Sequence, residues 1–408
     1  MKFRTIYNTG LRRIPMRHFL FTIVWITCLI CSPALAEGTK LADITDGTPL
    51  KLGNVRIIHS RVLDEDRPLF VALPPDYEVG EPHPVLYVMD GRTSFLPAVS
   101  VCNFLAKAGR MPSVIVVAVL NTNRNRDFTP VPTKGWTYSG GGGKFLDFMQ
   151  TELIPFIDRE YRTTKFRIFS GHSLCGMFAI HVLTHRPDMF NAILAMSPAV
   201  GYENEYTLDQ LEKLLKQPYP TSLQLFISLG NEPGYTKSVN RLTSLLQLDS
   251  AHSIEMKYRK YPELTHGTIP FKSFYDGLSF VCRDWPLTKN LAEPGLEGLK
   301  QHYATVNKRY GTSIVPSEAA INQLGYDLLQ QSSLKKAIRV FEYNVGLHPD
   351  SANVYDSLGE ALEASGDIHK ALLNYSKAIK LAELTKDANL QIFRSHLIRA
   401  RKKLSIAQ

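Results

Sequence analysis

Apolar and polar positions follow two different patterns along residues 55–285. Short runs of consecutive apolar residues, as expected of strands buried on both faces, alternate with longer stretches in which apolar residues recur every three or four positions, as in helices. The expected strands are Val55–Ile58, Leu69–Leu73, Val85–Met89, Ser113–Val119, Arg167–Phe169, Ala192–Met196, Leu223–Ser228 and Ile254–Tyr258. The first two are expected to pair antiparallel. Helices between the others predict a largely parallel sheet, and so a three-layer α/β domain.

A different pattern begins at Pro286, where a stretch containing Pro and Gly, residues 286–297, is followed by helical periodicity to the end of the sequence. We expect a connector over 286–316 and a small all-α segment over 317–408, ending in a helix at 390–404. Landmarks recur after 34 residues in this segment: Leu324-Gly325 and Leu358-Gly359, Ala337 and Ala371, Phe341 and Tyr375. The period and the residue types resemble the tetratricopeptide repeat, a helix-turn-helix unit. Ordinary amphipathic helices that agree by chance are the alternative.

Residues 1–36 have the pattern of a secretory signal peptide. Basic residues precede an apolar run, Phe19–Ile30, that is too short to span a bilayer comfortably, and a small-x-small sequence ends at Ala36. Ile30 before Cys31 argues against a lipoprotein signal. We therefore expect cleavage after Ala36, an α/β domain over 37–285, and export to the periplasm or the medium. An uncleaved membrane anchor is the alternative.

Composition narrows the classes of partner and cofactor. The 408 residues are 44% hydrophobic and 21% charged, which fits one large domain and a small one. Five of the bases behind the net charge of +9 lie before residue 37, so the remainder carries only +4 and gives no reason to expect nucleic acid binding. Beyond the signal only Cys102, Cys175 and Cys282 remain, without metal-ligand spacing. We expect no disulfide framework, no metal and no cofactor.

A candidate nucleophile lies between an expected strand and an expected helix. The tight turn Gly171–Gly176 has Ser173 at its centre, which is the context of a nucleophile elbow. The usual motif is Gly-x-Ser-x-Gly, whereas Cys175 occupies the second small position here and Gly176 follows. Because Cys is larger than Gly, we expect the turn to open slightly. A turn serine that caps the following helix is the alternative.

A serine nucleophile needs an imidazole base, which in this kind of domain follows it late in the chain. His266 lies in a loop after the last expected strand and is the candidate, while His172, inside the turn, is interpreted as structural. The third member, an acid that orients the imidazole, is expected after the strand that ends at Gly230. Glu232 occupies that loop, with Asp249 and Glu263 as rivals.

Two backbone amides are needed to stabilise the developing oxyanion. We expect the amide of Leu174, directly after the nucleophile, and that of Gly91, in the loop after Val85–Met89. Arg92 beside it is either a substrate-binding or simply an exposed arginine. The loop 121–143 carries three aromatic residues, which either line an acyl pocket or pack within the loop: Phe128, Trp136 and Tyr138.

Four ordered segments resemble those of the esterase family that includes esterase D and ferric enterochelin esterase-like hydrolases. They are Val85–Gly91, Asn121–Pro130, Gly171–Gly176 and Glu263–Thr268, and the resemblance covers roughly residues 55–285. It implies an α/β-hydrolase fold, with Ser173 as nucleophile and His266 as base, acting on carboxylic esters. Thioesterases and acyltransferases also occur in this family, so the resemblance leaves the acyl acceptor open.

The sequence thus favours a serine carboxylic ester hydrolase that forms an acyl-enzyme intermediate on a small-molecule ester. An acyltransferase or thioesterase on the same scaffold is one alternative. The other is a non-catalytic interaction protein that binds a protein partner through the helical repeats.

Overall fold

The computed structural model describes residue 47 and residues 50–407, except 218–222, 249–253 and 288–292. The expected signal peptide, residues 1–36, lies outside the described residues. Within the described part of the chain, no helix is both long and apolar enough to cross a membrane.

The strands of the α/β domain form one sheet, in the order β1-β2-β4-β3-β5-β6-β7-β8 over the described residues. Their bounds are β1 Asn54–Ser60, β2 Glu65–Ala72, β3 His83–Val88, β4 Ile115–Val119, β5 Thr163–His172, β6 Ala192–Met196, β7 Leu223–Leu229 and β8 Ile254–Lys260. β1 pairs antiparallel with β2, and β2 with β4, while all other neighbours are parallel. Each expected strand is confirmed, and so is the antiparallel opening pair.

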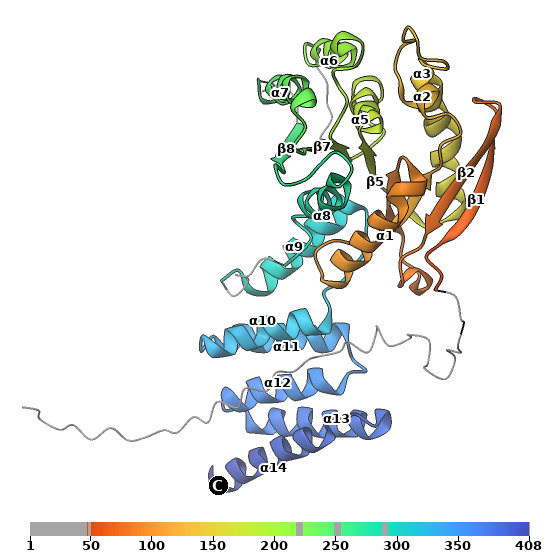
Figure 1. The fold of residues 1–408 in the computed structure, drawn as a ribbon. Coiled ribbons are helices and arrows are strands. Elements are labelled where there is room, and N and C mark those ends of the chain that lie inside the picture. Colours follow the sequence, from red (N-terminus) through yellow and green to blue (C-terminus); the bar gives the residue numbers. More distant parts are fainter. Residues whose placement is uncertain (1–46, 48–49, 218–222, 249–253, 288–292, 408) are drawn as a thin grey trace, which may run out of the picture. The chain divides into compact units, whose positions relative to one another are not determined.

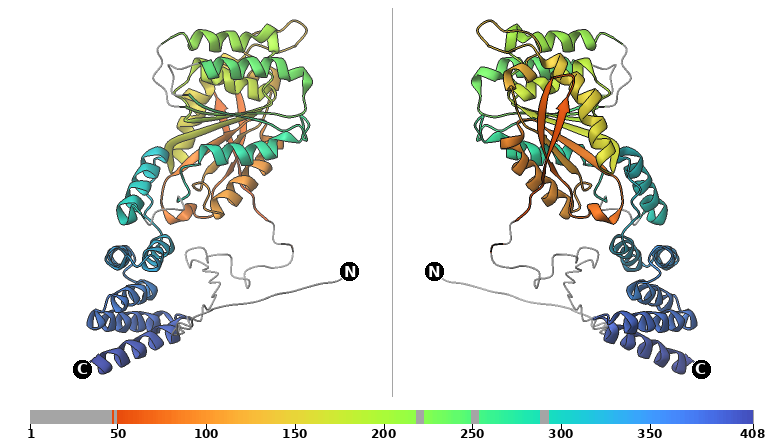
Figure 2. Two further views of the ribbon diagram at one scale, coloured as in Figure 1. Left: turned by 90° about the vertical axis from the view of Figure 1, so that its left-hand side faces the viewer. Right: turned by 90° about the vertical axis from the view of Figure 1, so that its right-hand side faces the viewer.

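Helices cover both faces of this sheet, as the edge-on views of Figure 2 show. They are α1 Gly91–Lys107, α2 Arg124–Phe128, α3 Gly142–Phe148, α4 Ile154–Glu160, α5 Leu174–His185, α6 Tyr202–Leu214, α7 Pro233–Leu248 and α8 Ile269–Val281. Successive strand residues point to opposite faces, so Tyr87 joins the cluster under α2 to α7 while Leu86 and Val88 join the cluster under α1 and α8. The three-layer α/β architecture is confirmed.

The rest of the described chain is helical (Figure 1). The helices are α9 Gly295–Tyr310, α10 Glu318–Gln330, α11 Leu334–Leu347, α12 Ala352–Ala364, α13 Ile368–Thr385 and α14 Leu390–Ala407. In two helix pairs, a glycine on the first helix packs closely against an aromatic ring on the second. A Cβ on Gly325 would lie 2.4 Å from the ring of Phe341, and a Cβ on Gly359 would lie 2.6 Å from the ring of Tyr375. The 34-residue landmarks therefore mark equivalent close contacts between α10 and α11 and between α12 and α13.

Helix α9 lies inside the interval expected to be a connector. Its buried residues divide between two cores: Leu299 packs with the C-terminal helices, whereas Val306 and Tyr310 belong to the α/β domain. The ring of Tyr310 is fully buried 4.9 Å from that of Phe166, and its hydroxyl donates to the Val281 carbonyl at 3.0 Å. Pro and Gly mark the ends of this interval, but its apolar positions at i, i+7 and i+11 form a helix.

Candidate active site

Ser173 lies between the end of β5 and the start of α5. Its backbone has φ 59° and ψ −116°, a conformation that non-glycine residues rarely adopt. The turn holds it by three backbone hydrogen bonds: Ser173 N donates to Met196 O at 2.9 Å, and Ser173 O accepts from Met177 N at 2.9 Å and from Ala199 N at 3.0 Å. Strain of this kind persists only where the surroundings impose it, and it is typical of functional sites.

Glycines relieve the crowding of this turn on both sides of Ser173. A Cβ on Gly171 would lie 2.2 Å from the Cys175 carbonyl oxygen, and a Cβ on Gly176 would lie 2.8 Å from the Met196 carbonyl oxygen. The close approach to β6 therefore falls on Gly176. Cys175 is fully buried, with its Sγ 4.0 Å from Arg124 Nη2.

The loops after β7 and β8 bring Glu232 and His266 together. Glu232 Oε2 lies 3.2 Å from His266 Nδ1, within ion-pair distance but without the alignment of a hydrogen bond. The other oxygen of Glu232 accepts a hydrogen bond from Ser197 Oγ at 2.8 Å. Asn231 N donates to Leu264 O at 2.7 Å, which ties the two loops to each other. Pro233 begins α7, and Glu232 points inward with only 6% of its side chain exposed.

Only one of the two other candidate acids lies in the described part of the chain. Glu263 is exposed and has no ion pair with His266 in the described part of the chain, and Asp249 lies outside the described residues. Ser197 was not singled out from the sequence, although its place directly after β6, at the same edge of the sheet as Ser173, is the signal that could have found it.

The imidazole of His266 lies between two other rings. Its centroid is 4.4 Å from that of His172 and 5.2 Å from that of Tyr235. Burial, together with the neighbouring His266, lowers the pKa of His172 to about 4, so His172 is neutral near pH 7. A neutral ring packed against His266 adds no competing positive charge.

The two expected amide donors are at helix starts. Leu174 is the first residue of α5 and Gly91 the first of α1, and amides at the first positions of a helix have no acceptor within it. A Cβ on Gly91 would lie 2.8 Å from the Val119 carbonyl oxygen, so only glycine fits there. The side chain of Arg92 is exposed.

A cavity of about 370 Å³ opens beside Ser173. Its lining includes Leu174, Arg124 and the rings of Trp136, Tyr202 and Tyr235. Of the three loop aromatics, Trp136 lines this cavity, whereas Phe128 is fully buried in the core and Tyr138 is 70% exposed. Trp136 packs edge-on against Tyr202, whose hydroxyl also bonds to Thr133. Of its three aromatic residues, the loop 121–143 therefore contributes only Trp136 to the lining of the cavity.

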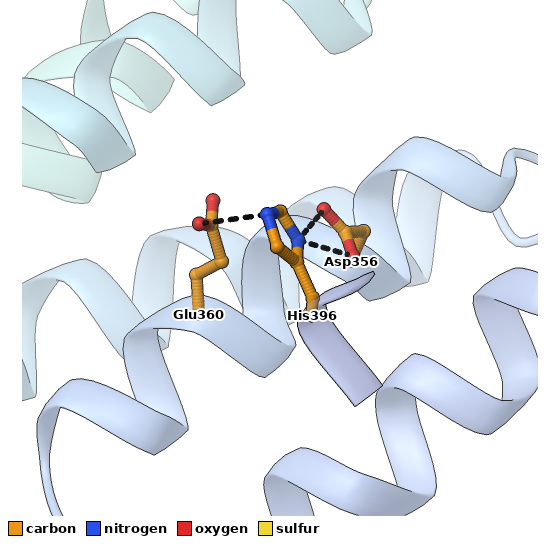
Figure 3. Close-up of side chains that lie close together, drawn as sticks. All are labelled: Asp356, Glu360 and His396. Atoms are coloured by element: carbon orange, nitrogen blue, oxygen red, sulfur yellow. Dashed lines mark hydrogen bonds and ion pairs between the residues drawn. The ribbon is translucent and has the colours of Figure 1, made fainter. Parts of the chain in front are cut away.

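A second cluster of titratable groups lies in the C-terminal helices: Asp356 and Glu360 on α12 with His396 on α14 (Figure 3). His396 Nδ1 lies 2.9 Å from Asp356 Oδ2, and Nε2 lies 3.7 Å from Glu360 Oε1. Tyr326 donates to Glu360 at 2.7 Å, and the Arg399 guanidinium lies 3.8 Å from Glu360 Oε1. The groups satisfy one another and have a cation beside them, so they cross-link α12 to α14 without requiring a metal ion.

Comparisons with known proteins point to esterases. Residues 60–261 match the family model described as "Putative esterase". Ferri-bacillibactin esterase BesA of Bacillus subtilis is 29% identical over 54% of this chain and 76% of its own length. The crystal structure of an IroE-like serine hydrolase from Shewanella oneidensis superposes with a TM-score of 0.60 at 27% identity, covering 72% of this chain and 99% of that one.

An uncharacterised protein from Capnocytophaga ochracea shares more of the fold. It covers 86% of this chain and 99% of its own, with a TM-score of 0.66 at 18% identity. The family match and the relatives together support an esterase, or more broadly a hydrolase, activity for this chain.

Proposed function

We propose that this protein is a serine carboxylic ester hydrolase in which Ser173, His266 and Glu232 form the catalytic triad. The observation that carries the proposal is the unusual backbone of Ser173 at the carboxyl edge of the sheet, together with Glu232 only 3.2 Å from Nδ1 of His266, whose ring packs against that of His172, the residue before Ser173. The strand-turn-helix context and the unusual backbone are typical of an exposed nucleophilic serine. An imidazole base with an acid behind it is what activates a serine hydroxyl.

In the proposed reaction, Ser173 Oγ attacks the ester carbonyl carbon while His266 takes the hydroxyl proton. The negative charge that develops on the carbonyl oxygen is stabilised by the amides of Leu174 and Gly91. His266 then protonates the leaving alcohol, and an acyl-enzyme remains on Ser173. A water molecule, deprotonated by His266, attacks the acyl carbon and releases the acid. Glu232 stabilises His266 in its cationic form during both steps.

The proposed substrate is a small-molecule ester of the siderophore kind. BesA, whose name describes a ferri-bacillibactin esterase, is one relative that supports this class. The rings of Trp136, Tyr202 and Tyr235 around Ser173 suit a planar acyl group. Thioester hydrolysis or transfer of the acyl group to an alcohol would use the same acyl-enzyme.

A labelling experiment tests the nucleophile. A fluorophosphonate should label the wild type at Ser173 and should not label Ser173→Ala, which should also lose nearly all turnover of a p-nitrophenyl ester. Ser238→Ala is the matched control, because Ser238 lines the same cavity, and it should still be labelled. Full labelling of Ser173→Ala would contradict the assignment. Adding an alcohol acceptor to the same assay separates hydrolysis from transfer.

For the helical segment 317–408 we propose tetratricopeptide-like repeats that bind a protein partner and place no residue in the active site. The equivalent contacts of Gly325 with Phe341 and of Gly359 with Tyr375 support this interpretation. We also propose that the chain is exported. Mass spectrometry of the mature protein should then find Glu37 at its N-terminus.

A further inference from the structure

Three residues from distant parts of the chain meet beside Ser173. Asp90 lies between β3 and α1, Arg124 begins α2, and Cys175 is the second residue of α5. Arg124 binds the Asp90 carboxylate with two parallel hydrogen bonds, Nε to Oδ1 at 2.8 Å and Nη2 to Oδ2 at 2.9 Å. Asn121 Nδ2 donates to the same Oδ1 at 2.6 Å, and Arg124 Nη2 lies 4.0 Å from Cys175 Sγ. These contacts join the loop before α1 to the start of α5.

Asp90 sets the direction of the first amides of α1. It has φ 54° and ψ 48°, a left-handed conformation that is uncommon for a residue with a Cβ, although Asp tolerates it better than most. Its carbonyl accepts hydrogen bonds from Thr93 N at 3.0 Å and Ser94 N at 3.1 Å, so its conformation fixes how α1 begins at Gly91. Burial alone would raise the pKa of Asp90, but the hydrogen bonds and charge of Arg124 outweigh burial and lower it. The Asp90 side chain is therefore charged and held in place by Arg124, directly before the first residue of α1.

The other end of the contact explains the unusual residue in the elbow. Cys175 directly follows Leu174, and its side chain is fully buried. Burial raises the pKa of the Cys175 thiol, so it is present as the neutral thiol. The sulfur lies 4.0 Å from Arg124 Nη2, a contact that glycine at this position could not make. Arg124 thus contacts the residue before Gly91 and the residue after Leu174.

We propose that Arg124 is a positioning residue that aligns the two oxyanion-binding amides, of Gly91 through Asp90 and of Leu174 through Cys175. The inference rests on the proposed serine hydrolase function. Arg124 also lines the cavity, so direct binding of an acidic substrate group is the competing role. The two roles predict different kinetics, because misaligned amides weaken only the transition state, whereas a lost substrate contact weakens binding as well.

The test measures kcat and KM for a neutral ester and for an ester with an acidic acyl group. Arg124→Gln and Asp90→Asn should each lower kcat about 10- to 100-fold for both esters with KM nearly unchanged, since losing one oxyanion donor outright costs roughly 10²- to 10³-fold. The double variant should lose little more than either single one, because the residues act as a unit. Arg124→Lys should recover part of the loss.

Two further variants keep the result interpretable. Cys175→Gly removes the contact with the elbow without disturbing the ion pair, and it should lower kcat by a smaller factor. Arg126→Gln is the matched control, because Arg126 is also on α2 but pairs with Glu65 and Asp127 and is not among the residues lining the cavity. It should keep kcat within a few-fold of the wild type. Circular dichroism and the urea unfolding midpoint verify that each variant is folded.

Wild-type kcat in Arg124→Gln, or a loss confined to the KM of the acidic ester, overturns the positioning role. Turnover that persists in Ser173→Ala overturns the proposed function itself. The two failures are therefore distinguishable.

Discussion

Replacing Glu232 by Gln tests the acid of the proposed triad with little change in volume. The carboxylate is buried between Ser197 Oγ, 2.8 Å from one oxygen, and His266 Nδ1, 3.2 Å from the other. Gln keeps an acceptor for Ser197 but removes the charge that faces the imidazole. The ground state, with neutral His266, loses little, whereas the transition state, with cationic His266, loses the attraction. We therefore expect kcat to fall and KM to stay nearly constant.

The geometry sets the size of the effect. Two unit charges 3.2 Å apart attract by about 5 kcal/mol at an effective dielectric constant of about 20 and by about 1.3 kcal/mol in bulk water. The Glu232 side chain is buried but that of His266 is 39% exposed, so the interaction falls between these limits. A value of about 3 to 4 kcal/mol corresponds to a loss in kcat of roughly 10²- to 10³-fold.

The assay is steady-state hydrolysis of a p-nitrophenyl ester by Glu232→Gln, with Glu263→Gln as the control. Glu263 is three residues from His266 but exposed, so its removal should leave kcat within about twofold. Ser197→Ala should fall between the two, because it frees Glu232 to move without removing its charge. Circular dichroism verifies folding of all three variants.

A wild-type kcat in Glu232→Gln would exclude Glu232 as the acid of the triad. If Glu263→Gln or Asp249→Asn then collapsed, the acid would be that residue. If Glu232→Gln, Glu263→Gln and Asp249→Asn all stayed active, the enzyme would work with Ser173 and His266 alone.

The remaining predictions concern the C-terminal part of the chain. A chain ending at Thr312 should resist urea better than one ending at Leu287, because the shorter chain lacks the fully buried Tyr310. Losing a buried aromatic side chain lowers the free energy of unfolding by about 3–5 kcal/mol. Equal urea midpoints would contradict a role for α9 in the α/β core. The hydrogen bond with Asp356 raises the pKa of His396 above its unfolded value of 6.5, so the pair stabilises the fold fully below pH 6.5 and loses this contribution as pH rises through the raised pKa. His396→Gln should therefore destabilise the protein more in acid than in alkali, and a pH-independent difference in urea midpoint would contradict this.

Local pattern was sufficient for most of the fold. Strands such as β6, Ala192–Met196, are short apolar runs bounded by polar residues, and their burial on both faces follows directly from that pattern. The placement of Ser173, Glu232 and His266 also followed from local signals, since each lies in the turn or loop that follows a strand and the carboxyl ends of parallel strands meet at one edge.

The features that the sequence did not predict depend on contacts between residues far apart in the chain. The interval 286–316 is bounded by Pro and Gly, and nothing in its local pattern shows that Tyr310 packs against Phe166, more than a hundred residues earlier in the chain. The role of Cys175 was hidden for the same reason. Its departure from glycine was visible, but the Arg124 side chain that it contacts comes from 51 residues away. The periodicity of a short stretch of sequence does not show which side chain from a distant segment will contact it.

Strained residues support the placement of the site independently of any motif. Asp90, Ser173 and Ser197 have φ of 54°, 59° and 41°, and they follow β3, β5 and β6 at the same edge of the sheet. Each is held by a partner that the proposed chemistry uses or needs: Arg124 binds Asp90, Ser197 binds Glu232, and the backbone of β6 binds Ser173. Such conformations persist where the surroundings impose them, and here all three lie at the edge of the sheet where Ser173 borders the cavity. A turn serine that merely capped α5 would need neither the strained neighbours nor the buried acid behind His266.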